Sequence, residues 1–271
     1  MSGNLDNEQF LLAQKLYSSY TIYSREQDLA RNLNELFDEE FLSAYSNYSM
    51  REIYNDVILK NYPNEASIKA AFINEVLLKA KNQVVIFELK VGSSRADLCK
   101  INGTSTAFEI KTDLDTTNRL EKQLSDYMDI FEHVFVICSE TRYNAIKDKV
   151  GDDCGIYTYV QRNNGTYSFK LRKRSILDMQ LDVQKQLSVL TKSDLVRYYK
   201  LDSEMDKKHM IAYVVSNYTN KKINDVFKKA LKDKYKKKWF FLSCYRDNIL
   251  EIDYQWFFKN RISPELMYGG R

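Results

Sequence analysis

Three short segments with the composition of β-strands follow one another between residues 84 and 111, in a chain whose two ends have helical periodicity. The segment 84–91 is rich in β-branched and aromatic residues, and the segments 95–101 and 105–111 are separated by Asn102-Gly103-Thr104. The chain has only 8 Gly and 2 Pro in 271 residues, too few for an all-β protein with many tight turns. We therefore expect an α/β (α+β) protein whose strands lie in the middle of the chain.

The pattern along the chain divides it into three regions. Residues 1–63 have apolar residues at helical spacing, and Pro63 ends that pattern. Residues 64–172 alternate: helices are expected at 65–80 and 117–131, a buried strand at 133–139, and a hairpin formed by 156–160 and 167–171. Residues 173–271 look helical again and are rich in lysine. The organisation predicted is an N-terminal helical region, a central α/β core and a basic C-terminal helical region.

Composition narrows the class of protein. Hydrophobic residues make up 44% of the chain and charged residues 29%, which is ordinary for a globular protein. No apolar run approaches the roughly 20 residues of a membrane helix, so we expect no membrane partner. The four cysteines form no CxxC pair and are expected to be free thiols in a cytoplasmic protein. Two widely separated His make a His-based zinc site improbable.

The turn at 102–104 decides which side chains share a face of the sheet. A two-residue Asn-Gly turn would pair Asp97 with Phe108, whereas a three-residue loop would pair Asp97 with Glu109. In the second register Leu98 opposes Phe108 and Ala96 opposes Ile110, so one face becomes continuously apolar. The hydrophobic pattern therefore predicts the three-residue loop.

That register places charged residues together on the other face, namely Arg95, Asp97, Glu109 and Lys111. Two carboxylates directly opposite each other destabilise a sheet unless something offsets their repulsion. A divalent cation with oxygen ligands would do so. Without the surrounding elements, an exposed pair bridged by Lys111 or Arg95 would be the simpler explanation.

The order of these elements and motifs resembles the PD-(D/E)XK nuclease superfamily. The pattern Arg95-Ala-Asp97, then Glu109-Ile-Lys111, then Gln123 and Tyr127 is similar to that of a little-characterised bacterial group within it. Ala96 stands where the superfamily has its proline. The resemblance covers roughly residues 65–140 and implies a restriction-endonuclease-like core, a mixed sheet flanked by helices.

The resemblance also implies an activity, hydrolysis of phosphodiester bonds with Mg²⁺ or Mn²⁺ as cofactor. Asp97, Glu109 and the Ile110 carbonyl would hold the metal. Lys111 would orient the attacking water, and Glu75 on the helix before the sheet would bind a metal-bound water or a second metal. The alternative from another class is a nuclease-fold protein that has lost catalysis and binds nucleic acid or protein. Glu88, on the strand before the hairpin, is expected to be a surface residue.

Charge is unevenly distributed and suggests the partner. Residues 1–130 hold 14 basic and 20 acidic residues, whereas residues 131–271 hold 27 and 17. A basic half suggests contact with a polyanion such as nucleic acid, although charge alone is explained more simply by a solvated lysine-rich helix face. Beside the expected site we favour DNA as the partner; a protein partner or a second copy stays open. Phosphate contacts are expected from Lys236, Lys237 and Lys238 at the end of a lysine-rich helix, and from Arg95. The resemblance assigns Gln123 and Tyr127 to fixing the site and the nucleic-acid backbone. The sequence leaves open DNA against RNA, strandedness, endo- against exonucleolytic cutting, and the pathway.

Overall fold

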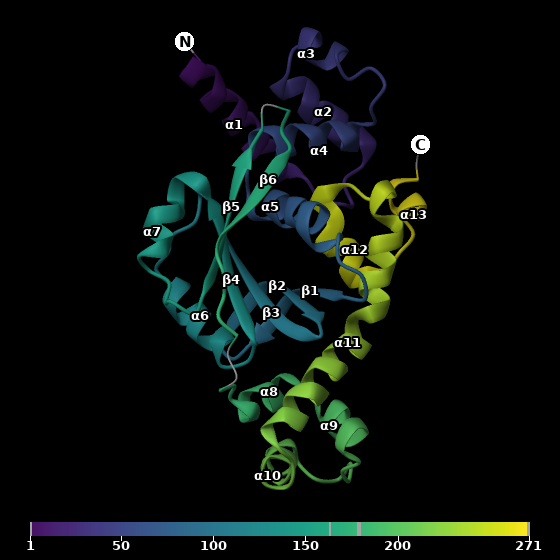
Figure 1. The fold of residues 1–271 in the computed structure, drawn as a ribbon. Helices are drawn as coiled ribbons and strands as arrows, with labels where there is room; N and C mark the ends of the chain where they lie inside the picture. Colours follow the sequence, from purple (N-terminus) through teal and green to yellow (C-terminus); the bar gives the residue numbers. More distant parts are fainter. Residues whose placement is uncertain (1, 163, 178–179, 270–271) are drawn as a thin grey trace. The chain divides into compact units, whose positions relative to one another are not determined.

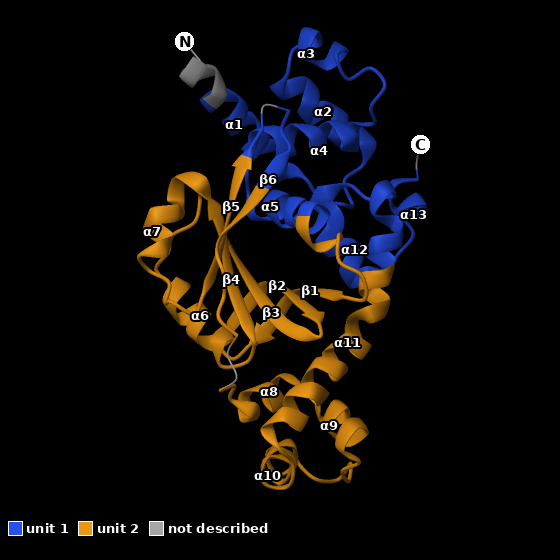
Figure 2. Ribbon diagram, viewed as in Figure 1, with its two compact units in different colours: residues 1–75, 161–168, 241–271 blue, residues 76–160, 169–240 orange. Residues whose placement is uncertain are grey.

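A computed structural model describes residues 2–162, 164–177 and 180–269. The chain separates into two compact units, each assembled from distant stretches of sequence (Figure 2). The first unit contains residues 1–75, 161–168 and 241–271, and the second contains residues 76–160 and 169–240. The two units differ in formal charge. The first holds 11 basic and 16 acidic residues, a balance of −5, and the second holds 30 and 21, a balance of +9.

The centre of the second unit is a six-stranded sheet in which the strands lie in chain order (Figure 1). β1, β2 and β3 form an antiparallel meander, and β3, β4 and β5 are parallel. The strands are β1 (Val84–Val91), β2 (Ser94–Asn102), β3 (Thr104–Lys111), β4 (His133–Ser139), β5 (Gly155–Gln161) and β6 (Tyr167–Lys173). β3 is buried along almost its whole length, as expected for a strand paired on both edges.

Helices complete the second unit. α6 (Leu120–Met128) connects β3 to β4, and α7 (Tyr143–Lys147) lies between β4 and β5. α8 (Val183–Val189), α9 (Lys192–Tyr199) and α10 (Lys207–Asn217) cluster beside the first turns of the long α11 (Asn220–Tyr245) (Figure 1). Ile223, Phe227 and Leu231 repeat at i and i+4 along α11 and are buried, so one stripe of this helix packs inward.

The β2–β3 hairpin has the register that the apolar pattern predicts. Leu98 pairs with Phe108 and Asn102 pairs with Thr104, so only Gly103, at φ +75°, stands outside the ladder. A glycine adopts this left-handed conformation without the steric cost that a side chain would add. The predicted register is therefore confirmed, with Gly103 as the one residue between the two strands.

The first unit is helical. Its helices are α1 (Ser2–Ser19), α2 (Glu26–Leu36), α3 (Glu39–Ser43), α4 (Met50–Asn61), α5 (Glu65–Phe72), α12 (Tyr254–Asn260) and α13 (Pro264–Tyr268). Ser49 and Glu52 form a capping box at the start of α4, which satisfies backbone N–H groups that the helix itself cannot. The core of α1, α2 and α4 consists of Ala13, Leu16, Leu29, Leu33, Ile53, Tyr54, Val57 and Ile58.

The predicted fold class, a mixed sheet flanked by helices with helical regions at both ends, is confirmed. The three consecutive regions stay a prediction about chain organisation, because by contacts residues 241–271 group with residues 1–75. All four cysteines are free thiols, as expected. In the described parts of the chain, no helix combines the length and apolar composition that crossing a bilayer requires.

Candidate functional site

Three carboxylates lie in one row across β1, β2 and β3 of the second unit. Phe87 pairs with Leu98 and Leu89 with Ala96, so Glu88 stands opposite Asp97. Continuing the β2–β3 register by one residue places Asp97 opposite Glu109. One carboxylate oxygen of Glu88 lies within 4.8 Å of one of Asp97. The register therefore brings three acidic side chains to one place on the sheet.

Glu88 has an unusual backbone for a strand residue. Its φ is +55°, in the left-handed region that residues other than glycine rarely adopt. Such a conformation costs about 1–3 kcal/mol and persists only where the surroundings impose it. Glu88 was expected on the surface, but its side chain is only 16% exposed and lies 3.9 Å from the guanidinium of Arg95. The strand register could have placed Glu88 at the site from the sequence. Asp97 on β2 has one neighbour on each side, Glu109 on β3 and Glu88 on β1.

Glu109 is held by three side chains. Its Oε1 accepts from Lys111 Nζ at 2.8 Å and from Gln123 Nε2 at 2.6 Å. Its Oε2 accepts from the Tyr127 hydroxyl at 2.8 Å. Gln123 and Tyr127 are four residues apart on α6, so one face of this helix presents both groups to the carboxylate. The structure thus brings together the motif residues that the resemblance selected.

Hydrogen bonds also hold the side chains of Lys111 and Asp97 in place. Lys111 donates to Gln123 Oε1 at 3.0 Å as well as to Glu109, and Asp97 Oδ2 accepts from the Ile110 N–H at 2.6 Å. Asp97, Glu109 and Lys111 are 8%, 2% and 8% exposed, so all three are buried. Buried charges are costly unless they are paired. Lys111 is paired with Glu109 at 2.8 Å, and the more exposed Arg95 lies 3.9 Å from Glu88.

The carboxylates perturb their neighbours. Burial, followed by the charge of Glu109, raises the pKa of the Tyr127 hydroxyl far above its ordinary value. Burial raises the pKa of the Cys99 thiol, and the charges of Asp97, Glu88 and Glu109 raise it further. Both groups therefore keep their protons at neutral pH. Tyr127 is a hydrogen-bond donor here, and its hydroxyl also lies 2.8 Å from the Arg95 carbonyl, so its single proton is shared between that carbonyl and Glu109.

Of the remaining predicted residues, Arg95 reaches only Glu88 at the edge of the cluster, and the others are not described as part of it. Glu75 is exposed in the π-helical turn Ile73–Leu77 and is grouped with the first unit, so its metal-binding role stays a prediction. The Arg95 side chain is 63% exposed. Lys236 and Lys237 are exposed on α11, whereas Lys238 is half-buried. Their contacts with nucleic acid also stay predictions.

One lysine of α11 points inward, which the sequence pattern did not indicate. Lys228 Nζ lies 3.0 Å from Glu132 Oε1, and its side chain is 14% exposed. Glu132 also accepts from Asn224 Nδ2 at 3.0 Å and from the Ser105 N–H at 2.6 Å. Glu132 therefore joins α11 to the start of β3. These donors hold its pKa below the usual value against the opposing effect of burial.

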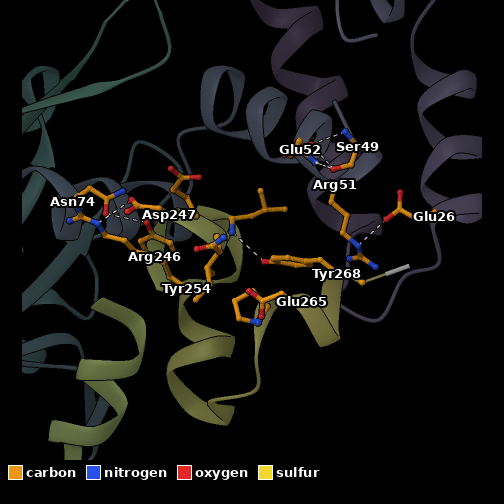
Figure 3. A pocket seen from close by; sticks show the side chains of 16 residues that line it. Glu26, Ser49, Arg51, Glu52, Asn74, Arg246, Asp247, Tyr254, Glu265 and Tyr268 are labelled. Atoms are coloured by element: carbon orange, nitrogen blue, oxygen red, sulfur yellow. Dashed lines mark hydrogen bonds and ion pairs between the residues drawn. The ribbon is translucent and has the colours of Figure 1, made fainter. Parts of the chain in front are cut away.

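A cavity of about 950 Å³ lies in the first unit (Figure 3). Its wall carries carboxylates and two arginines, Arg51 and Arg246. The guanidinium of Arg51 is 3.0 Å from Glu26 and donates to the Ile22 carbonyl at 3.2 Å, while that of Arg246 is 3.2 Å from Asp247. The charges of this wall are paired largely within the protein, and the cavity takes no part in the carboxylate and lysine cluster.

Fold and site together define a mixed α/β protein with a carboxylate and lysine cluster on its sheet. The family described as Bacteriophage P4 protein cII matches residues 59–254, most of the chain. The chain belongs to this family.

Two individual proteins are similar to the chain. Protein cII of Enterobacteria phage P4 is 33% identical over 135 residues, which is 48% of this chain and 51% of that protein. The chain thus matches about half the length of this relative. SPO1766, a protein of unknown function from Silicibacter pomeroyi, is 10% identical, with a TM-score of 0.33 over 51% of this chain and 93% of that one. That likeness is too low to support an argument.

Proposed function

We propose that the second unit is a metal-dependent nuclease that hydrolyses phosphodiester bonds of nucleic acid, with DNA favoured, in the cytoplasm of a bacterium or of a phage-infected cell. The observation that carries this proposal is the row of Glu88, Asp97 and Glu109, in which Asp97 and Glu109 are buried and Lys111 is bound to Glu109. The excess of basic residues in the same unit, 30 against 21, favours an anionic substrate.

The donors present suit Mg²⁺ or Mn²⁺. Asp97, Glu109 and the Ile110 carbonyl offer only oxygen ligands, which hard divalent cations prefer. A bound cation would stabilise negative charge on the phosphate and lower the pKa of a coordinated water.

The protein's own residues position the reacting groups. Gln123 and Tyr127 hold Glu109 in one orientation, and preorganised groups lose little energy to rearrangement during the reaction. Lys111 carries the positive charge that would orient the attacking water or contact the phosphate. Arg95, exposed beside Glu88, would contact a neighbouring phosphate.

The test is cleavage of labelled DNA and RNA, single- and double-stranded, with Mg²⁺ or Mn²⁺. Asp97→Asn and Lys111→Ala should each lower the rate by at least about 10²-fold, the usual effect of removing one electrostatic stabiliser of a transition state. Glu121→Gln is the matched control, because Glu121 is an exposed carboxylate on α6. Full activity of Lys111→Ala on every substrate would contradict its catalytic role.

The alternative is a catalytically inactive module that binds nucleic acid or protein. Calorimetric titration with Mn²⁺ separates the two. A nuclease should bind Mn²⁺ as the wild-type protein and lose that binding in Asp97→Ala. Nucleic-acid binding without metal binding and without cleavage would favour the alternative.

A further inference from the structure

One stripe of α11 combines exposed lysines with an exposed aromatic ring. Lys222, Lys229 and Lys236 are seven residues apart, and seven residues are nearly two turns, so the three side chains point in similar directions. Phe240 follows Lys236 by one turn and continues the stripe. Its side chain is 69% exposed, whereas Phe227 on the packed stripe of the same helix is fully buried.

The charge of this stripe is positive. Lys237 is exposed and lies three residues before Phe240, and Lys236 lies four before it, so two ammonium groups flank the ring. Asp233 lies on the same side of the helix, but it is 3.3 Å from Lys236 and accepts from the Tyr198 hydroxyl at 2.8 Å. Asp225, between Lys222 and Lys229, lies 3.6 Å from Lys228. Four exposed lysines against these two aspartates leave the stripe a net positive charge.

We infer that this stripe binds single-stranded nucleic acid, with Phe240 stacked on an unpaired base and the lysines on the phosphates. An aromatic ring beside cationic groups is the arrangement by which proteins bind single strands without sequence preference. A duplex hides the faces of its bases, so only an unpaired base offers its face to Phe240. The inference rests on the proposed function only in taking nucleic acid as the partner, and it narrows the substrate to unpaired segments.

The experiment measures binding of the full chain in EDTA, so that no cleavage occurs. The probes are a fluorescein-labelled 20-nucleotide oligothymidylate and a labelled 20-base-pair duplex, each at several salt concentrations. Phe240→Ala should weaken binding of the single strand by about 5- to 150-fold, the usual loss of one base–aromatic stack, without changing its salt slope. Phe240→Trp should restore the affinity.

Lys237→Gln should instead reduce the salt slope for the single strand by about 0.7, the value for one phosphate contact. Tyr213→Ala is the matched control, because Tyr213 is an aromatic residue of α10 that is 47% exposed. It should leave both affinities unchanged. Phe240 is mostly exposed, so its replacement should not impair folding, and an unfolding curve verifies this.

If Phe240→Ala binds the single strand as tightly as the wild-type protein does, the inference is overturned. An equal loss on the duplex, or binding to neither probe, would also overturn it; the latter result is expected if the stripe docks a protein. The nuclease proposal is judged separately, by metal binding and by cleavage that depends on Asp97. The failure of one is therefore distinguishable from the failure of the other.

Discussion

Glu109 shows how a residue can serve both the fold and the proposed chemistry. Two like charges standing opposite each other would by themselves make removal of either carboxylate neutral or slightly stabilising. The contacts change that expectation for Glu109, which accepts from Lys111, Gln123 and Tyr127. Without Glu109 the buried ammonium of Lys111 would lose its ion-pair partner and keep Gln123 Oε1, a neutral oxygen, as its other described acceptor.

We therefore predict that Glu109→Ala lowers the free energy of unfolding by about 3–5 kcal/mol, the usual cost of removing one partner of a buried ion pair. The double variant Glu109→Ala/Lys111→Met should recover part of this loss, because the unpaired charge is gone. Urea unfolding of both proteins measures the difference. A single variant as stable as the wild type would show that Lys111 finds another partner or reaches water.

Asp253 is the buried acid of the first unit. Its Oδ2 accepts from the hydroxyls of Tyr20 and Tyr268, each at 2.8 Å. Burial raises its pKa to about 6 from 3.8, although both tyrosines and Arg51 act in the opposite direction. Because the folded-state pKa is the higher one, the folded state binds the proton more tightly than the unfolded chain. Asp253 therefore favours folding most below about pH 4, and this contribution is lost as the pH rises to about 6.

We predict that the stability of the wild type relative to Asp253→Asn falls by up to ~3 kcal/mol between pH 4 and pH 7, from the pKa difference of about two units. Denaturant unfolding of both proteins at several pH values measures the difference between their unfolding free energies. The other titrating groups are present in both proteins, so their contributions cancel. Asp247→Asn is the control, since the Asp247 side chain is 84% exposed. A difference independent of pH would show that Asp253 titrates alike in both states.

At the scale of elements, β4 and β5 pack closely because one of them carries a glycine opposite an aromatic ring. Gly155 pairs with Phe135, and a Cβ at position 155 would lie 2.3 Å from the Phe135 ring and 2.8 Å from the backbone nitrogen of Ser175. Both distances are far below ordinary van der Waals contact. The sheet therefore depends on the absence of a side chain at this position.

We predict that Gly155→Ala destabilises the protein by about 1–3 kcal/mol, as overpacking of a close-fitting interior does. Gly151→Ala is the control in the same loop and strand region, because nothing lies within 4 Å of its added Cβ. Thermal unfolding of the two variants compares them directly. Equal stabilities would mean that Phe135 moves aside without cost.

Features that depend on residues close together in the sequence were predictable from it. The hairpin register was predictable because only one register pairs Leu98 with Phe108 and so makes one face of the hairpin continuously apolar. The buried stripe of α11 was predictable because its apolar residues repeat with the 3.6-residue period of a helix. The inward ion pair of Lys228 with Glu132 was not predictable, because the two residues are 96 positions apart and nothing in the periodicity links them.

At the scale of the whole molecule, the grouping of the chain depends on such distant pairs. The hydrogen bond between Tyr20 and Asp253 joins residues 233 positions apart, and Asn55 donates to Glu251 at 2.7 Å. Single-sequence patterns describe the faces of elements and not their partners, so the sequence indicated three consecutive regions. The site was accessible to sequence reasoning because its residues lie within one meander and the helix that follows it, from Glu88 to Tyr127.

The first unit is made of segments that lie far apart along the chain, and their positions set the order in which they leave the ribosome. Its early helices, α1, α2 and α4, already contain a shared apolar core within residues 13–58. The acceptor of Tyr20, Asp253, emerges only after the entire second unit has been translated. Contacts between such distant residues carry a loop-closure cost that slows folding. The early helices of the first unit therefore stay without this partner until the second unit has been synthesised, and a segment made after that unit completes them.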